Sequence, residues 1–253
     1  MAKTKSVYFC NNCGAESPKW IGRCPVCGEW NTYVEEVVST KSAAGGRGEF
    51  GTMEQSKVRP QRIDDIQITE ESRIDLGNGE LNRVLGGGLV RGSLVLIGGE
   101  PGIGKSTLIL QTVLALKGQK ILYVSGEESA RQLKLRAERI GGNAPDCYIV
   151  CETSLEDIFV HIRNVAPDIV VIDSIQTIAT SAMESSPGSV GQVRECAASL
   201  LKFAKQTNTP VLLVGHINKE GSIAGPKVLE HIVDTVLQFE GDRHYLYLSL
   251  IQI

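Results

Sequence analysis

Two cysteine pairs near the N-terminus have the spacing of a metal site. Cys10 and Cys13 form one C-x-x-C pair, and Cys24 and Cys27 form a second pair ten residues later. A glycine follows each pair, and its freedom at positive φ lets a tight turn aim backbone N–H groups at thiolate sulfurs. Four thiolates complete a tetrahedral Zn²⁺ site and leave no position open for water, so we expect a structural zinc centre. The alternative, four buried or disulfide-linked cysteines, is disfavoured by this spacing.

The two tryptophans of the chain lie on either side of the second cysteine pair, at Trp20 and Trp30. We expect them to pack around the small metal-centred core. The alternative is an aromatic platform for nucleic-acid bases. The other cysteines, Cys147, Cys151 and Cys196, fall in expected strands and a helix, where we expect small buried apolar side chains and not ligands.

A phosphate-binding loop is indicated by the pattern G-x-x-x-x-G-K-[ST], which lies between an apolar strand and an apolar helix. In such a loop, backbone N–H groups surround the β-phosphate, Lys105 bridges the β- and γ-phosphates, and Ser106 offers a hydroxyl to Mg²⁺. The sequence therefore predicts a site for a nucleoside triphosphate with Mg²⁺. The residues that form the loop are Gly99, Glu100, Pro101, Gly102, Ile103, Gly104, Lys105, Ser106 and Thr107.

Carboxylates follow two of the expected strands. Asp173 ends the apolar run 169–172, and we expect it to support Mg²⁺ at the carboxyl edge of a parallel sheet. Its alternative role, as a strand-end or helix-cap residue, is less favoured downstream of a phosphate-binding loop. Glu127 follows the strand after that loop and is our first choice to orient the attacking water. Its neighbour Glu128 has the alternative of stabilising a helix N-terminus.

Three further segments have two open interpretations each. His216 ends an apolar strand, where it would either sense the γ-phosphate or act as a hydrogen-bonded strand-end histidine. The basic loop 219–227 suits contacts with a phosphate backbone, although on charge alone a solvated lysine face is preferred. The long loop 176–190 is a second candidate for contact with a nucleic-acid strand.

The elements that must position these residues alternate between short apolar strands and amphipathic helices, which is typical of an α/β fold with a mostly parallel sheet. We expect each helix to close a right-handed crossover. The expected strands are 94–98, 120–125, 147–151, 168–173, 210–215, 233–239 and 244–252. The expected helices are about 105–117, 128–140, 154–165 and 190–207.

Composition predicts an ordinary globular protein: 253 residues, 42% apolar, with a net charge of −3. No long apolar run or N-terminal apolar region is present, so we expect a cytoplasmic protein without a membrane partner. Residues 1–60 carry a net charge of +2 and the rest −5, so contact with nucleic acid must come from local patches. We expect a zinc module over 1–38, a flexible linker over 39–60 and an ATPase domain over 61–253.

The order of these motifs resembles the RadA, or Sms, family of bacterial DNA repair proteins. The resemblance covers about residues 7–245. It rests on the four cysteines, Glu80-Leu-Asn-Arg-Val-Leu-Gly-Gly-Gly-Leu89, the loop 99–107, Val124-Ser-Gly-Glu-Glu-Ser129, Asp173-Ser-Ile-Gln-Thr177, His216 and the segment from Lys219 to His231.

The resemblance implies a RecA-like ATPase core that forms a homohexamer, binds ATP, Mg²⁺ and single-stranded DNA, and drives branch migration of recombination intermediates. It implies recombinase and replication proteins as partners. Residues 99–107 then bind nucleotide, Asp173 supports Mg²⁺, and Glu127 and Lys105 are catalytic.

The resemblance also implies a Lys-Asn-Arg-Phe-Gly motif and a Lon-protease-like domain, and neither occurs in these 253 residues. Because a basic residue from a neighbouring subunit stabilises the transferring phosphoryl group in such ATPases, we expect weak, poorly DNA-stimulated hydrolysis. Two alternatives stay open: a regulatory ATPase of the circadian-clock type, against which the zinc module speaks, and an ATP-binding remnant without DNA-stimulated turnover.

Overall fold

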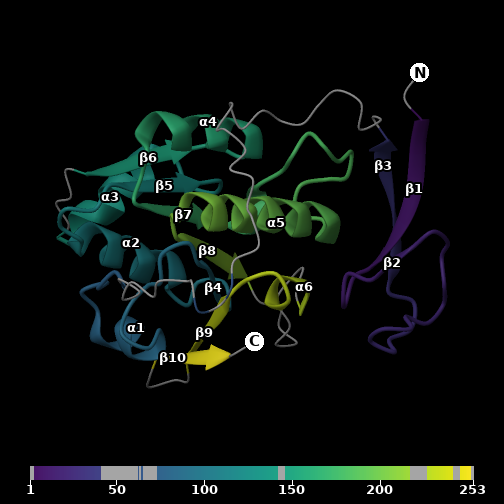
Figure 1. Cartoon of the computed structure of the whole chain (residues 1–253), viewed down its shortest axis with the longest axis horizontal. Helices are drawn as coiled ribbons and strands as arrows, with labels where there is room; N and C mark the ends of the chain where they lie inside the picture. The colour runs from purple at the N-terminus through teal and green to yellow at the C-terminus, as the bar shows by residue number, and fades with distance from the viewer. Residues whose placement is uncertain are drawn as a thin grey trace.

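The computed structural model describes residues 3–40, 62, 64, 73–141, 146–216, 227–241 and 246–251. They form two separate β-sheets (Figure 1). The first, here called the N-terminal module, is an antiparallel sheet with strand order β2-β1-β3. Its strands are β1 (Lys3–Cys10), β2 (Glu16–Ser17) and β3 (Tyr33–Thr40).

The second sheet is the centre of the larger domain and has the strand order β10-β9-β4-β8-β7-β5-β6. The strands β9 to β6 in this order run parallel, and β10 pairs antiparallel with β9 at one edge. The strands are β4 (Leu94–Gly99), β5 (Ile121–Ser125), β6 (Cys147–Cys151), β7 (Ile169–Asp173), β8 (Val211–His216), β9 (Thr235–Gly241) and β10 (Leu246–Ile251). The helices are α1 (Gly79–Val84), α2 (Lys105–Ala115), α3 (Ala130–Arg139), α4 (Leu155–Val165), the 3₁₀ helix η2 (Ile175–Thr177), α5 (Val190–Thr207) and α6 (Lys227–Glu230).

The α/β class predicted from the sequence is confirmed. All seven expected strands and all four expected helices are present, with ends within two residues of the prediction. The sequence analysis gave no strands for the N-terminal module and so missed β1, β2 and β3. In the larger domain it missed α1, η2 and α6, which have at most six residues each. Elements this short carry too little periodicity to be recognised from the sequence.

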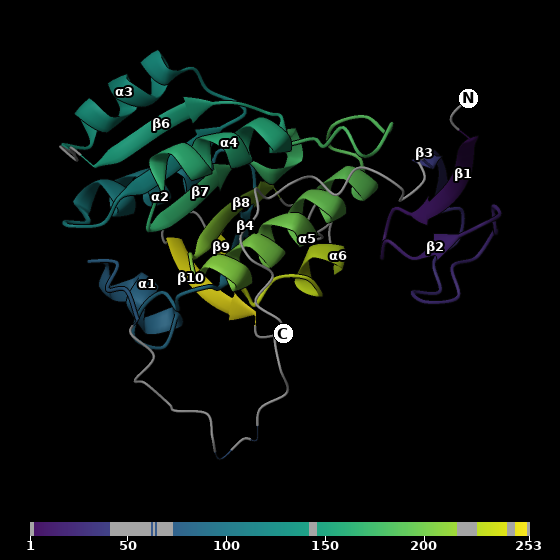
Figure 2. The same cartoon turned by 45° about the horizontal axis from the view of Figure 1, so that its top comes forward.

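Helices cover both faces of the larger sheet. Alternate residues of each strand point to opposite faces, so Leu94 and Leu96 of β4 pack with α4 and α5, whereas Val95 and Ile97 pack with α1, α2 and α3. Figure 2 shows α4 and α5 in front of the strands and α2 behind them. Because both faces are buried, the inner strands β4, β5, β7 and β8 are nearly continuous apolar runs, as is typical of parallel sheets.

The loop 176–190, for which the sequence predicted no helix or strand, is held to α5 by hydrogen bonds. Gln192 is 1% exposed, and its side-chain amide donates to the carbonyls of Thr180, Met183 and Ser185 while its oxygen accepts from the Thr180 N–H. The loop begins within η2. Its contact with nucleic acid stays a prediction.

Within the part of the chain that the structure describes, no helix combines the length and the apolar character needed to cross a membrane.

Two leucines of α3 provide a matched test of this packing. Leu133 is fully buried against the sheet, whereas Leu135 is 52% exposed. We expect Leu133→Ala to lower the free energy of unfolding by about 2–5 kcal/mol and Leu135→Ala to change it by less than about 0.5 kcal/mol. Chemical denaturation of both variants measures this, and equal effects would contradict the arrangement of α3.

Candidate nucleotide site and metal centre

The phosphate-binding loop and the predicted catalytic side chains meet at one edge of the larger sheet. The register pairs Gly99 with His216 and Ser125 with Asp173, so β4, β8, β5 and β7 end side by side. Glu127 follows β5 by two residues. Parallel strands place their carboxyl ends at the same edge, where ligands of such sheets bind.

Glycines give the phosphate-binding loop its shape. Gly104 precedes α2 at a φ of 110°, a conformation that other residues rarely adopt, and it provides no side-chain cap to the helix. The first N–H groups of α2 are therefore available to an anion. A Cβ on Gly99 would lie 2.7 Å from the carbonyl oxygen of Phe239, so only glycine permits this approach of β9.

Lys105 lies inside the loop and is 3% exposed. Its ammonium nitrogen donates to the carbonyls of Gly99 at 2.7 Å and Glu100 at 2.8 Å. Burial lowers the pKa of Lys105, while the negative charges of Asp173 and Glu127 oppose that shift. The lysine is thus held by backbone at the position where it would meet phosphate oxygens.

Asp173 is 4% exposed, and both of its oxygens accept hydrogen bonds. Ser106 donates to Oδ1 at 3.0 Å and Tyr123 donates to Oδ2 at 2.5 Å. Burial and the Asp173 charge raise the pKa of Tyr123, which keeps its hydroxyl protonated as a donor. Hydroxyl and carboxylate oxygens suit Mg²⁺. Ser106 and Asp173 would therefore hold Mg²⁺, which supplies positive charge beside the β- and γ-phosphates when bound.

The two adjacent glutamates have different hydrogen-bond and ion-pair partners. Glu127 Oε1 accepts from Ser174 Oγ at 2.5 Å and lies 2.9 Å from His216 Nε2. Burial raises the pKa of Glu127, but these hydrogen bonds and the nearby Lys105 charge outweigh it, and the pKa is lowered. Glu127 is therefore an ionised carboxylate in the same cluster as the lysine of the loop.

Glu128 points into a different environment. It forms an ion pair with Arg136 of α3 at 2.6 Å, and its backbone N–H donates to Ser125 Oγ. It stands immediately before Ser129, which caps α3 in a reciprocal pair with Gln132. Glu128 thus belongs to the start of α3, the alternative considered from the sequence.

Tyr123 and Ser174 were not recognised from the sequence as part of the site. Tyr123 lies within the strand that precedes Glu127, and Ser174 follows Asp173 directly. The available signal was their position beside predicted site residues near strand ends. A tyrosine in an apolar strand more often indicates packing than function, so this signal was weak.

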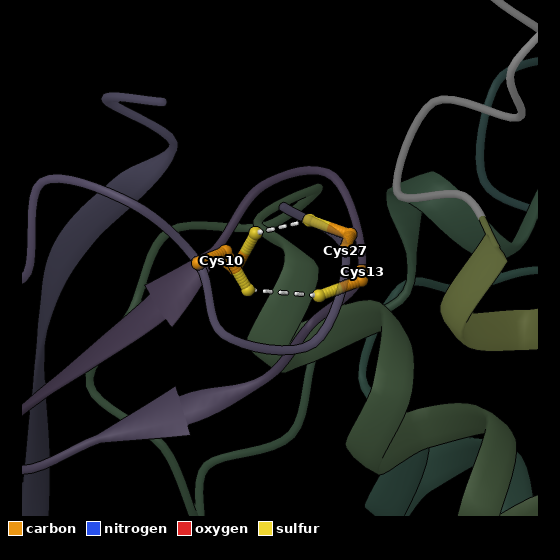
Figure 3. A group of neighbouring side chains, drawn as sticks. Cys10, Cys13 and Cys27 are labelled. Carbon is orange, nitrogen blue, oxygen red and sulfur yellow. Dashed lines mark hydrogen bonds between the residues drawn. The ribbon is translucent and has the colours of Figure 1, made fainter. Parts of the chain in front are cut away.

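The four N-terminal cysteines converge on one point, and Figure 3 labels three of them, Cys10, Cys13 and Cys27. Their sulfurs all lie within 4.8 Å of one another, with Cys10 and Cys27 at 3.7 Å and Cys13 and Cys24 at 3.4 Å. Tetrahedral Zn–S bonds of about 2.3 Å place sulfurs about 3.8 Å apart. All four cysteines are free of disulfides. The cluster fits Zn²⁺.

The turn after Cys24 stabilises the thiolate form of this residue. Burial opposes ionisation of Cys24, yet the N–H groups of Cys27 and Val26 and the hydroxyl of Tyr33 bring the pKa of Cys24 to about 6. Gly28, at a φ of 79°, donates its N–H to the Cys24 carbonyl. These are the turns that the glycines after each pair predict.

The expected packing of the tryptophans is wrong. Trp20 is 53% exposed and Trp30 67% exposed, with the Arg23 guanidinium 5.8 Å from the centre of the Trp30 ring. The core of the N-terminal module consists of the four cysteines with Tyr33, Tyr8, Ala15 and Ile21. Both indoles are therefore largely exposed to solvent and are not part of this core.

One of the other cysteine predictions is also wrong. Cys196 is buried and Cys147 is half-buried, but Cys151 is exposed. The reason is that β6 is the outer strand of the sheet, so its end is less covered than a central strand.

Arg194 of α5 connects the N-terminal module with the larger domain. Its guanidinium pairs with Glu16 at 2.8 Å and donates to the Gly14 carbonyl at 3.4 Å, and Figure 1 shows the module beside α5. The pair is exposed, and such pairs contribute about 0–1 kcal/mol.

Several predicted segments are described only in part or not at all. Strand β3 extends to Thr40, two residues beyond the predicted end of the module, and the rest of the predicted linker lies outside the described residues. The predicted basic loop is likewise outside them except for Lys227, which begins α6.

Comparison with known proteins places this architecture in a family. The family described as AAA domain matches residues 57–222, about two thirds of the chain. The chain belongs to the AAA domain family. Ahead of the AAA domain, the family described as rubredoxin metal binding domain matches residues 8–35, the part of the chain that holds the four cysteines.

Relatives of the whole chain are bacterial DNA repair proteins. The DNA repair protein RadA of Bacillus subtilis is 55% identical over 249 residues, and that of Pseudomonas aeruginosa is 50% identical over 243 residues. These matches cover 98% and 96% of this chain but 54% and 53% of the relatives, so the chain spans about half of their length. The resemblance to the RadA family is thus confirmed.

A solved structure supports the fold of the AAA domain. The KaiC-like protein PH0186 from Pyrococcus horikoshii has a TM-score of 0.54 and 22% identity, covering 72% of this chain and 88% of its own. At this identity the likeness shows the fold alone.

The metal centre leads to a matched prediction. Cys24→Ser removes one of four ligands, and because metal binding and folding are coupled in small zinc modules, we expect loss of about one equivalent of zinc per chain. Cys151→Ser, which changes a cysteine outside the cluster, keeps the zinc. Metal analysis of both purified variants measures this, and full zinc in Cys24→Ser would contradict the assignment.

Proposed function

We propose that this chain is the nucleotide-hydrolysing part of a DNA repair ATPase. The observation that carries the proposal is the 3.0 Å contact between Ser106 of the phosphate-binding loop and Asp173 at the end of β7. It joins two segments that are 67 residues apart. The hydroxyl and the carboxylate that it brings together are oxygen ligands of the kind that suit Mg²⁺, which supports the proposal.

In the proposed reaction, each of the groups at this edge of the sheet has its own role in hydrolysis. The N–H groups of the loop and the Lys105 ammonium bind the phosphates, and Glu127 accepts a proton from water. The water oxygen forms a bond to the γ-phosphorus, and the bond from that phosphorus to the bridging oxygen of ADP breaks. The products are ADP, phosphate and a proton held at Glu127.

Single-stranded DNA is the proposed partner of this ATPase, and branch migration of recombination intermediates within a homohexamer is its proposed role. The identity of 55% to a protein named for DNA repair supports this class of partner. The loop 176–190, fixed by Gln192, is the described segment that we propose to contact the strand. Recombinase and replication proteins are proposed as further partners.

A regulatory ATPase of the circadian-clock type is the less favoured proposal. The KaiC-like structure shares the fold at 22% identity, which carries no function. The four-cysteine centre and the RadA relatives favour the DNA repair class.

We expect two substitutions in the nucleotide site to have different effects on ATP binding and on hydrolysis. Lys105→Ala removes a charge that meets phosphate, so ATP binding and turnover both weaken. Glu127→Gln keeps the size of the side chain but cannot take a proton, so ATP binds while hydrolysis falls by about 10²-fold or more. Nucleotide titration and steady-state hydrolysis measure the two effects.

Glu128→Gln is the control for this pair, because Glu128 is held by Arg136. We expect it to retain turnover. Normal hydrolysis by Glu127→Gln together with loss in Glu128→Gln would reverse the assignment.

DNA binding provides the test of the partner. We expect the 253-residue chain to bind a labelled single-stranded oligonucleotide with ATP and Mg²⁺, and the affinity to fall as salt rises, because phosphate contacts release counterions. Lys105→Ala, which binds ATP poorly, binds the oligonucleotide less. An affinity that is undetectable with or without ATP would favour the regulatory or remnant alternatives.

A further inference from the structure

Two donors from neighbouring strand ends share one oxygen of Glu127. Ser174, directly after β7, donates to Oε1 at 2.5 Å, and His216, the last residue of β8, approaches the same oxygen at 2.9 Å. Among the described residues, no hydrogen bond to Oε2 is present. Within the described part of the chain, the carboxylate is therefore held by Oε1 and not by Oε2.

The direction of the His216 hydrogen bond follows from the charge of its partner. The pKa of Glu127 is lowered, and an ionised carboxylate only accepts hydrogen bonds. His216 Nε2 must therefore carry the proton. The other ring nitrogen, Nδ1, is buried and has no hydrogen-bond partner within the described part of the chain. The imidazole thus directs its hydrogen bond to Glu127.

Close packing fixes the segment that carries Ser174. A Cβ on Gly126 would lie 1.9 Å from Thr177 Oγ1, so glycine is required beside Glu127. The Thr177 hydroxyl donates to the Ser174 carbonyl at 2.8 Å, and the Gly126 N–H donates to the Asp173 carbonyl at 2.9 Å. These contacts hold the end of β5 against the segment after β7.

We propose that His216 and Ser174 are positioning residues for hydrolysis, holding Glu127 by Oε1 so that Oε2 takes the proton from water. This inference rests on the proposed function, in which Glu127 is the general base. A base contributes to the rate only in the correct orientation, and two donors from different strands fix the plane of its carboxylate. His216 then acts through Glu127 and not directly on the phosphate.

The first test separates turnover from binding. His216→Ala and Ser174→Ala lower kcat for ATP by about tenfold or more, with ATP affinity unchanged within about twofold. His216→Gln keeps an N–H donor and restores much of the rate. His161→Ala, on α4 and outside the hydrogen bonds of Glu127, is the control and keeps wild-type turnover. Parallel loss of ATP affinity, or no rescue by His216→Gln, would overturn the proposal.

A double-mutant cycle decides how His216 acts. In a Glu127→Gln background, single-turnover hydrolysis should show no further loss from His216→Ala, because residues that act through one another are not additive. An additive loss would mean that His216 contacts the phosphate itself. If Glu127→Gln alone hydrolyses normally, the proposed function fails in its choice of base. If Glu127 is essential but His216→Ala and Ser174→Ala are unimpaired, only the positioning inference fails.

Discussion

The buried carboxylate of Asp173 is the group on which the arrangement of the AAA domain depends. A charge that is 4% exposed is costly unless hydrogen bonds satisfy it. Tyr123 from β5 and Ser106 from α2 provide these bonds, and the adjacent strands β5 and β8 place Glu127 and His216 around it. The position of β7 between β5 and β8 thereby brings the phosphate-binding loop and the candidate base to one place.

Tight packing around this carboxylate comes from helices on both faces of the sheet and from glycines at strand ends. Because Gly99 has no side chain, the backbone of β9 can approach it, and because Gly126 has none, the side chain of Thr177 can pack against it. A methyl group at either position would move a strand end that carries a predicted site residue. The precision of the site is therefore a property of the packed edge, because each side chain there is oriented by a neighbouring segment.

The N-terminal module is stabilised by a different principle. Its buried residues are few, and a sheet of this size cannot bury enough apolar surface to fold by that means alone. Four sulfur atoms that lie close enough together to bind one metal ion take the place of a hydrophobic core. The indole side chains lie outside this core. The exposed pair between Arg194 and Glu16 connects the module to α5.

Local patterns in the sequence were enough to predict the main strands and helices of the larger domain, the phosphate-binding loop and the metal centre. Strand and helix positions follow from the spacing of apolar residues, the phosphate-binding loop from nine consecutive residues, and the metal centre from two cysteine pairs. Each of these signals lies within one short segment, where the chemistry of a turn or the period of a helix is visible without knowledge of the rest of the chain.

The different surroundings of Glu127 and Glu128 are visible only in the tertiary structure, because adjacent residues with the same side chain have the same local pattern. The contacts that separate them come from Ser174, His216 and Arg136, which follow or belong to other elements. The exposure of Trp20 and of Cys151 was decided in the same way. Strand order and register determine which distant residues come into contact. Neither can be predicted from the pattern within a single segment.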